Sequence, residues 1–491
     1  MRTDPTSNQG QLSKKSLLKA SRSKWVRFST WIVIALLFVL WTSSFWWLLA
    51  LPLFFDLYIS RKLPWNFWKG FKNKTLRTIF DWIDAIIFAL IAVYIINIYF
   101  FQNYQIPSSS LEKSLLVGDF LFVSKVSYGP RVPMTPISFP LAQHTMPILG
   151  TKSYFDKPQW EYKRIPGFGH IKRNDIVVFN FPAGDSVITK ITNPDFYTTC
   201  YMLALQNDVS VEDARRFVLS RPDDFGKLVY RPVDKRENYV KRCIGLPGDR
   251  LQIVDNQVII NGTPIQDPPN VQYVYYVQTK GGYLSERQFK KWNILLSDIE
   301  LIPENSYKIQ LQHFKKNVNG GYNPVYEMPL TQSLLSELRK SPLIDTIFIS
   351  KDTLGGMNEG GTMYPLNKNN HWTRDNYGPI WIPKKGATIT LNAHNLMVYS
   401  HVIVHYEKKD LVIRNGKVYI DGKPVTTFTF SMDYYWMMGD NRHKSADSRA
   451  WGFVPEDHVV GKPLLVWLSL DKDKTLFEGK IRWKRFFKKA S

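Results

Sequence analysis

The sequence predicts a mainly β protein, in which an antiparallel β domain with large insertions follows N-terminal transmembrane helices. The two long apolar runs both lie before residue 102. Beyond it, short runs rich in Val, Ile, Tyr and Phe alternate with Asn-Gly, Asp-Gly and Pro-Gly turns, a pattern typical of β-hairpins. The chain has 491 residues, 44% of them hydrophobic, which is ample for a core of this size.

The first hundred residues alternate between basic and apolar segments. Residues 1–28 form a basic N-terminal tail, and residues 29–59 a first hydrophobic membrane segment. That segment is too long for a secretory signal peptide and suffices for one crossing of a bilayer, which takes about 20 residues. A basic loop over 60–78 precedes a second transmembrane helix over 79–101. Because Lys and Arg concentrate in cytoplasmic loops, we expect this loop in the cytoplasm and everything after residue 101 outside it.

Two arrangements of the first hydrophobic segment remain open. A single crossing, the favoured arrangement, places the basic tail outside the cytoplasm, against the rule just used. The alternative is a hairpin that turns back at the polar break Thr42-Ser43-Ser44, so that both flanks lie on the same side. Neither arrangement changes the side on which the β domain lies.

Residues 102–474 form the predicted β domain. Residues 251–262 and 411–424, each of which contains an Asn-Gly pair, read as two hairpins of the same design. Residues 398–406 read as a strand that places His401 and His405 on one face, without a third metal ligand, so we expect core or edge histidines. Short helices are expected over residues 211–219, 285–296 and 330–338.

Composition limits the classes of binding partner that can be expected for this chain. The net charge of +22 is spread along the chain, and no nucleic-acid-binding motif is visible, so nucleic acid is not expected as a partner. An anionic bilayer surface fits the charge better, since apolar spans are present. The basic aromatic C-terminal tail, residues 475–491, either rests on such a surface or is solvated and frayed. Cys200 and Cys243 lie outside any Cys-x-x-Cys pattern, so neither a zinc site nor a disulfide-dependent fold is expected.

Four stretches contain the candidate chemistry. Three consecutive serines, Ser108 to Ser110, follow the second apolar run within ten residues, and a serine hydroxyl becomes a nucleophile only beside a base. Lys241 lies in an apolar run that reads Y-V-K-R-C-I-G-L-P-G-D over 239–249. The remaining two stretches read N-D-I-V-V-F-N-F-P over 174–182 and M-G-D-N-R-H-K-S-A-D-S-R over 438–449.

In content and order these motifs resemble those of bacterial type I signal peptidases, the membrane-bound Ser/Lys leader peptidases. The resemblance implies that Ser110 is the nucleophile and Lys241 the general base. It implies that Ser108 donates to the oxyanion and that Ser445 holds the lysine amine in line. Supporting ion pairs and substrate-binding residues are expected at Asp440 with Arg242, at Asp447 with Arg449, and at Ile106, Pro107 and Leu111.

The resemblance also implies a function and a location. The chain would be a membrane-bound serine endopeptidase that removes N-terminal signal peptides from exported preproteins through an acyl-enzyme, without a metal or organic cofactor. It would lie in the bacterial inner membrane with its catalytic domain on the periplasmic side. Compared with the family's compact core, three stretches look like folded insertions: about 130–172, 183–237 and 268–380.

A lysine base makes a physical demand on its surroundings. An unperturbed lysine has a pKa near 10.4 and holds its proton at neutral pH. Burial among apolar groups lowers that pKa, because desolvation disfavours the charged form. Tyr239, Cys243 and Ile244 offer such surroundings for Lys241.

The sequence departs from the family pattern around the nucleophile. The family usually has Gly and Met there and then Pro-Thr, whereas this chain has Ser109, Leu111, Glu112, Lys113 and Ser114. Ser110 and Lys113 also spell the Ser-x-x-Lys of penicillin-binding enzymes, but the Lys-Thr-Gly partner is missing. The alternative from another class is a non-catalytic, membrane-anchored export scaffold that retains the motifs.

Overall fold

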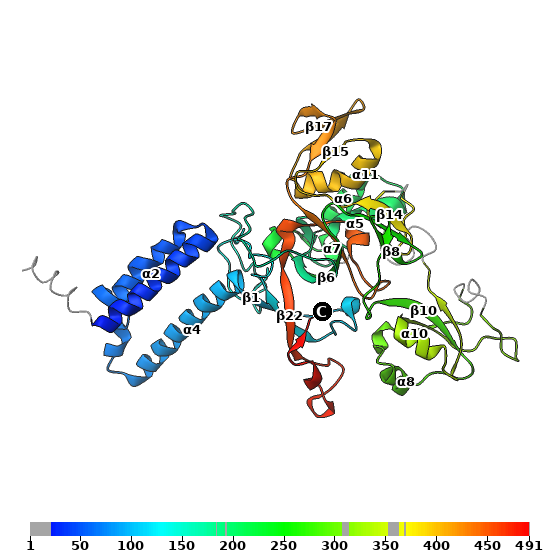
Figure 1. Ribbon diagram of the computed structural model, residues 1–491, viewed down its shortest axis with the longest axis horizontal. Coiled ribbons are helices and arrows are strands. Elements are labelled where there is room, and N and C mark those ends of the chain that lie inside the picture. The colour runs from blue at the N-terminus through cyan, green and yellow to red at the C-terminus, as the bar shows by residue number, and fades with distance from the viewer. Residues whose placement is uncertain are drawn as a thin grey trace, which may run out of the picture.

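The computed structural model describes residues 21–182, 184–191, 194–306, 314–351, 363–367 and 370–490. Most of the basic N-terminal tail predicted from the sequence lies outside these residues. A helical arm extends from one side of a mostly β body (Figure 1). The arm contains the apolar helices α2 (Arg22–Thr42) and α4 (Lys74–Tyr99), which are the two described helices long and apolar enough to cross a membrane.

The first hydrophobic segment folds back on itself. Helix α2 ends where Ser43 adopts a left-handed φ of 50°, and the short helices η1 (Phe45–Leu49), α3 (Ala50–Phe55) and η2 (Asp56–Ser60) return along it. Trp31 stacks on Phe54 with ring centroids 4.2 Å apart. Of the two arrangements left open by the sequence, the structure therefore has the hairpin at Thr42-Ser43-Ser44.

Helix α4 runs in the same direction as α2. Phe38 and Trp41, near the end of α2, each lie 6.2 Å from Tyr99 at the end of α4. Asn73 caps the start of α4 by accepting a hydrogen bond from the Thr75 N–H. The start of α2 and the basic loop before α4 therefore lie at the same end of the arm (Figure 1).

The β body is built on one antiparallel sheet, as the sequence predicts, and this sheet curls into a half-barrel. Its strand order is β1-β2-β22-β3-β6-β20-β21, and β23 pairs with β22. The strands of this sheet are β1 (Phe101–Gln105), β2 (Asp119–Ser124), β3 (Ile176–Asn180), β6 (Asn238–Gly245), β20 (Tyr434–Met438), β21 (Val454–Pro455), β22 (Val459–Ser469) and β23 (Lys488–Lys489).

Smaller sheets surround this one. Both predicted hairpins are present, as β7 (Arg250–Val254) with β8 (Gln257–Ile260) around Asp255-Asn256 and as β16 (Leu411–Arg414) with β17 (Lys417–Ile420) around Asn415-Gly416. The other described strands are β4 (Ser186–Ile188), β5 (Leu228–Tyr230), β9 (Thr263–Pro264), β14 (Tyr377–Trp381), β15 (Thr388–Thr390), β18 (Lys423–Val425) and β19 (Thr427–Thr429).

The stretch 268–380 contains a sheet and a core of its own. Its strand order is β11-β12-β10-β13, and side chains such as Val277, Met328 and Leu338 are fully buried beneath it. Its elements are β10 (Gln272–Thr279), α8 (Glu286–Lys291), β11 (Glu300–Ile302), β12 (Val325–Thr331), α10 (Gln332–Leu338) and β13 (Ile344–Ile349).

The stretch 183–237 contributes α5 (Phe196–Asn207), α6 (Val211–Ser220) and α7 (Pro222–Phe225). Helix α6 lies where a helix was predicted over 211–219. In contrast, residues 130–172 contain only isolated bridges, such as Ser138 with Tyr154.

The strand predicted over 398–406 is wrong. These residues lie in helix α11 (Ala393–His401) and the helical turn η8 (Val402–Tyr406). Asn392 starts the helix by accepting from the Asn395 N–H, and Val398, Val402 and Tyr406 enter the main core four residues apart. That spacing is helical, and it outweighs the strand preference of the β-branched and aromatic side chains.

The C-terminal tail packs against the sheet. Arg485, 9% exposed, forms an ion pair with the fully buried Asp119 of β2. Arg482 donates to the Val117 carbonyl at 2.8 Å. The frayed alternative is therefore wrong for residues 475–490, although Phe477 and Phe487 remain exposed.

Candidate active site

Ser110 lies on a single helical turn that follows β1. The chain leaves β1, runs extended through Ser108 and enters the turn η4 (Ser109–Leu111). Leu111, 1% exposed, and Ile106, 4% exposed, hold this turn by packing into the core beneath the sheet. The turn leaves the side chain of Ser110 only 9% exposed.

Lys241 approaches Ser110 from strand β6, which contacts the turn η4 although it lies four strands away from β1 in the sheet. Its Cα pairs with that of Val177 on β3, and its side chain is 4% exposed. Its Nζ donates to Ser110 Oγ at 2.5 Å. Burial lowers the pKa of Lys241 to about 8, although the carboxylates of Asp447 and Asp440 act in the opposite direction. The fold thus joins a hydroxyl to a dry amine with an unusually low proton affinity.

The other two predicted hydroxyls differ in their placement. Ser108 Oγ is exposed and lies 3.4 Å from Ser110 Oγ. Ser445 Oγ is buried without a hydrogen-bond partner among the described residues, so the expected bond to Lys241 is not present. Ser445 instead packs against Gly439, where a Cβ would lie 2.3 Å from Ser445 Oγ and 2.6 Å from the Ser110 carbonyl. Only glycine lets the three segments approach so closely.

Both expected ion pairs are present and buried. Arg242 binds Asp440 through two hydrogen bonds of 2.7 Å, and Ser114 Oγ donates to the same carboxylate at 2.6 Å. Arg449 binds Asp447 at 2.8 and 2.9 Å, and the Gly439 N–H donates to Asp447 at 3.0 Å. These bonds tie the loop 439–449 to β6 and to the turn that carries Ser110.

Asp440→Ala is expected to destabilise the protein by about 3 to 5 kcal/mol, because it leaves the Arg242 guanidinium buried and unpaired. Chemical unfolding of the detergent-solubilised chain measures the loss. Asp156→Ala is the matched control, since it breaks an ion pair with side chains 46% and 56% exposed and should cost less than about 1 kcal/mol. Equal losses in the two variants would contradict the role given to the buried pair.

The sequence did not predict that the stretch 268–380 forms hydrogen bonds with the loop 439–449. The backbone of Gln272 on β10 donates to the Asp440 carbonyl at 2.8 Å and accepts from the Arg442 N–H at 2.9 Å. His443 Nδ1 accepts from the Val274 N–H at 3.2 Å, which requires the proton on Nε2, 2.9 Å from Asp375. No local sequence pattern predicts these contacts with β10, since they join groups about 170 residues apart.

The same stretch also explains the departures from the family pattern. Ser109 Oγ donates to Asp298 Oδ1 at 3.2 Å, and Lys113 Nζ donates to the Asn293 carbonyl. Glu112 is 4% exposed, and burial raises its pKa to about 7. The side chains of Ser109 and Lys113 therefore face the stretch 268–380. Their place in the sequence is explained by that contact.

Three residues were expected to bind substrate. Ile106 and Leu111 lie inside the core, whereas Pro107 is exposed beside Ser108. In this conformation only Pro107 of the three is open to an incoming peptide.

The two cysteines lie in different hydrophobic clusters. Cys243 is buried beside Phe179 and Met437, Cys200 is buried in a separate cluster with Phe196, and both thiols are free. Within the described ranges, no group of three or more His, Cys, Asp or Glu side chains is placed to hold a metal ion.

Comparison with known proteins agrees with this arrangement. A family model described as "Signal peptidase, peptidase S26" matches residues 79–309 and 427–468, more than half of the chain. The chain belongs to this signal peptidase family. As a member it is a serine endopeptidase, a hydrolase that cleaves signal peptides.

Relatives of this signal peptidase are similar along most of its length. Signal peptidase I of Buchnera aphidicola subsp. Acyrthosiphon pisum is 23% identical over 400 residues, which cover 80% of this chain and 77% of the relative. Signal peptidase I of Buchnera aphidicola subsp. Baizongia pistaciae is 23% identical over 430 residues, 87% and 89% of the two chains. Signal peptidase I of Haemophilus influenzae is 22% identical over 412 residues, 83% and 74% of the two chains.

Proposed function

We propose that this signal peptidase cleaves exported preproteins through an acyl-enzyme formed on Ser110, with Lys241 as general base. The observation that carries the proposal is the 2.5 Å contact between Lys241 Nζ and Ser110 Oγ, made by an amine that is almost fully buried. A lysine in such surroundings is neutral often enough at neutral pH to accept the serine proton.

The reaction then proceeds in two halves. Neutral Lys241 takes the Ser110 proton as Oγ attacks the scissile carbonyl, and the Ser108 hydroxyl with the Ser110 N–H stabilises the oxyanion. The lysine ammonium gives its proton to the leaving amine, which frees the mature protein and leaves the signal peptide as an ester on Ser110. Water next attacks the ester while Lys241 takes its proton, and Oγ recovers a proton as the peptide acid leaves.

The supporting residues position these groups. Asp440 with Arg242 and Asp447 with Arg449 hold the loop 439–449 against Ser110. Ser445 lies in that loop, and its hydroxyl, which has no hydrogen-bond partner among the described residues, is proposed as a second acceptor for the lysine ammonium. Small-residue subsites of the Ala-x-Ala type are proposed beside Pro107.

Membrane anchoring completes the proposal. The tail over 1–28, the segment over 29–59, the loop over 60–78 and the helix over 79–101 would hold the catalytic domain, 102–474, at the periplasmic face of the inner membrane. The parallel course of α2 and α4 supports this, because it brings the basic loop and the start of α2 to one end of the arm. That arrangement satisfies the positive-inside rule.

The test is cleavage of a preprotein by the purified full-length chain in detergent. A substrate with an Ala-x-Ala motif before its mature N-terminus should yield one product, whose N-terminal sequence identifies the cut. The same preprotein with the motif changed to Asp-x-Asp is the control and should remain intact. Failure of the folded chain to cut any such preprotein would favour the export scaffold.

Ser108→Ala is expected to lower kcat by about 10² to 10³ without unfolding the protein, because it removes one oxyanion donor from an exposed position. Rates of preprotein cleavage measure the effect, and Ser108→Thr, which keeps a hydroxyl, should recover part of it. A change confined to KM would contradict the oxyanion role.

The rate should depend on pH through Lys241, which must be neutral to act. Since its pKa is lowered to about 8, kcat/KM should rise about tenfold per pH unit below 8 and level off above it. A pH series from about 5.5 to 10 measures the profile. Glu112, whose pKa is raised to about 7, is the control: Glu112→Gln should leave the inflection near 8 in place. An inflection near 10 would contradict the lysine base.

A further inference from the structure

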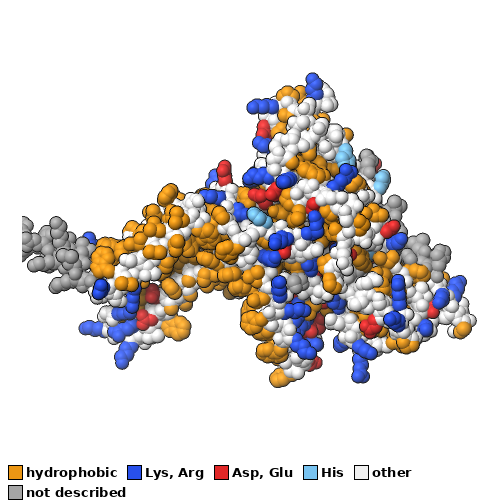
Figure 2. Space-filling model, in the orientation of Figure 1, with side chains coloured by type: hydrophobic (Ala, Val, Ile, Leu, Met, Phe, Trp, Pro, Cys, Tyr) orange, Lys and Arg blue, Asp and Glu red, His pale blue; other side chains and the backbone are white. Residues whose placement is uncertain are grey.

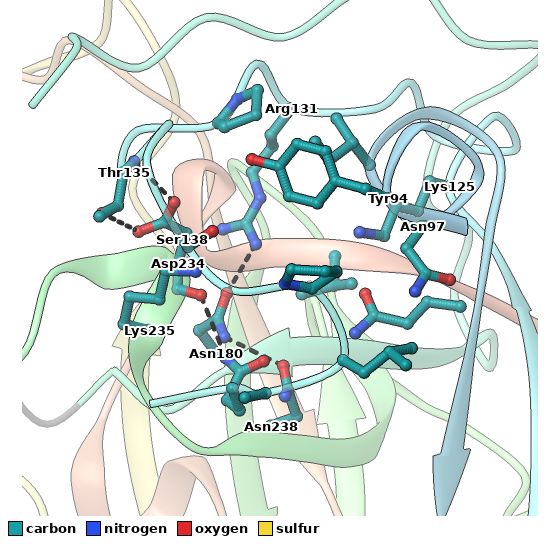
Figure 3. Close-up of a pocket in the computed structure, with 18 of the residues that line it drawn as sticks. Tyr94, Asn97, Lys125, Arg131, Thr135, Ser138, Asn180, Asp234, Lys235 and Asn238 are labelled. Atoms are coloured by element: carbon teal, nitrogen blue, oxygen red, sulfur yellow. Dashed lines mark hydrogen bonds between the residues drawn. The ribbon is translucent and has the colours of Figure 1, made fainter. Parts of the chain in front are cut away.

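A polar cavity of about 350 Å³ lies where the membrane helix α4 meets the β body. Neither Ser110 nor Lys241 lines it. Its wall includes Tyr94 and Asn97 from the last turns of α4, Lys125 just after β2, and Arg131 at the start of the stretch 130–172 (Figure 3). The cavity falls within the size range of small-ligand sites, roughly 300 to 1,000 Å³.

The cavity carries an excess of positive charge. Lys125, Arg131 and Lys235 line it, against the one carboxylate of Asp234. That carboxylate is already engaged by the Thr135 N–H and hydroxyl, both at 2.8 Å. Arg131 donates to neutral acceptors, the Asn180 side-chain oxygen at 2.6 Å and the Asp457 carbonyl at 2.5 Å. The three cationic side chains of the cavity therefore have little negative charge with which to pair.

Lys125 is the clearest sign of a missing anion. Within the part of the chain that the structure describes, its amine has no hydrogen-bond or ion-pair partner. Burial, together with the charges of Arg131 and Lys235, lowers its pKa to about 7, and Asp234 opposes the shift only weakly. Figure 3 shows the Lys125 amine and the Arg131 guanidinium entering the same space beside the Tyr94 ring. Retaining a cation there without a partner is unfavourable.

The cavity lies at the level expected for lipid headgroups. Tyr94 donates from the membrane helix to the Pro136 carbonyl at 2.7 Å, and Trp41 donates from α2 to the Pro166 carbonyl at 3.1 Å. Leu141 and Ile148, in the same stretch 130–172, are exposed at 73% and 105%. Figure 2 shows hydrophobic side chains continuing from the arm onto the neck of the body. Apolar surface beside a basic cavity is typical of a membrane interface.

We propose that this cavity binds a phosphate group, with Lys125 and Arg131 as its cationic contacts. The side-chain amides of Asn97, Asn103 and Asn238 also line the cavity and supply neutral donors. Such a group has two sources at a membrane surface, an anionic phospholipid headgroup and free phosphate. The site is separate from the peptidase chemistry and does not depend on it.

Native mass spectrometry of the full-length chain in dodecyl maltoside tests the lipid source. The wild type should retain about one dimyristoylphosphatidylglycerol and no dimyristoylglycerol, which lacks the phosphate. Lys125→Gln should weaken retention at least about tenfold, the usual worth of a charged hydrogen bond, whereas Lys125→Arg should retain the lipid. Lys163→Gln is the matched control, because it removes the same charge from an exposed position and should change nothing.

Thermal unfolding tests whether free phosphate binds in the cavity. Sodium phosphate should raise the unfolding midpoint of the wild type above that in sodium chloride of equal ionic strength, and the rise should be missing in Lys125→Gln. Either response, if it depends on Lys125, supports the proposed site and shows whether the phosphate group comes from a lipid or from free phosphate. The proposal is overturned if neither ligand responds to Lys125→Gln, or if Lys163→Gln loses as much binding. Without ligand, Lys125→Gln should unfold no earlier than wild type, which excludes misfolding as the cause.

Discussion

Lys241→Met is expected to lower kcat/KM by at least about 10⁴-fold while leaving the protein as stable as the wild type or more stable. Methionine has a similar volume and no charge, so the buried position stays filled. The loss of activity follows because Ser110 then has no group within reach to take its proton. Cleavage rates and chemical unfolding, measured on one preparation, test both halves of this prediction.

The gain in stability expected for Lys241→Met depends on pH. The folded pKa of Lys241, about 8, is lowered from 10.5, so the buried ammonium costs stability in full below pH 8. This cost fades as the pH rises from 8 towards 10.5. Lys241→Met should therefore gain up to about 3 kcal/mol at pH 7 and much less at pH 10. A gain that grows with pH would contradict this explanation.

Lys113→Met is the matched control for the base. Lys113 stands three residues after Ser110 and spells the competing Ser-x-x-Lys motif, but its amine donates to the Asn293 carbonyl of the inserted stretch. Its loss should cost less than about tenfold in rate, which is the size of one lost peripheral hydrogen bond. If Lys113→Met abolished cleavage and Lys241→Met did not, the penicillin-binding type of dyad would be favoured.

Ser110→Ala should likewise abolish cleavage, by at least about 10⁴-fold, because no acyl-enzyme can form. Stability should change by less than about 1 kcal/mol, since only one hydroxyl and its bond to Lys241 are removed. The variant should still bind preprotein, so it should protect a signal peptide from cleavage by added wild type. Preprotein cleavage and binding assays in the same detergent measure these effects.

Ser109→Ala is the control for the nucleophile, because it removes a neighbouring hydroxyl of the same tri-serine run. Ser109 Oγ donates to Asp298 and not to Lys241. A loss of less than about tenfold is expected. Similar losses for Ser109→Ala and Ser110→Ala would show that the turn, and not the Ser110 hydroxyl, is what the reaction needs.

Several features could be predicted from the sequence because short-range physics controls them. The hairpin at 411–424 follows from Asn415-Gly416 and that at 251–262 from Asp255-Asn256, because both pairs adopt the left-handed backbone of a tight turn. The pairing of Asp447 with Arg449 could be expected from residues two apart in one loop. In contrast, side-chain preference predicts a strand over residues 398–406, whereas the four-residue spacing of Val398, Val402 and Tyr406 favours the helix that forms.

Other features depend on contacts between distant segments. The folding back of residues 45–60 depends on ring packing such as Trp31 on Phe54, and the bracing of the loop 439–449 depends on β10. Nor could one expect the burial of Glu112, or that Ser445 Oγ has no hydrogen-bond partner among the residues that the structure describes. Each of these features depends on side chains and backbone groups that only folding brings close, and a local sequence pattern does not contain that information.

The sequence by itself determined the family, the mainly β class, the apolar helices and the residue types of the candidate site, because motifs and periodicity are local. Only the tertiary structure decided that Lys241 Nζ reaches Ser110 Oγ and is dry enough to have a lowered pKa. The same is true of the cationic cavity beside α4. Distance and desolvation arise when strands far apart in the chain pack together, and a proton affinity follows from both.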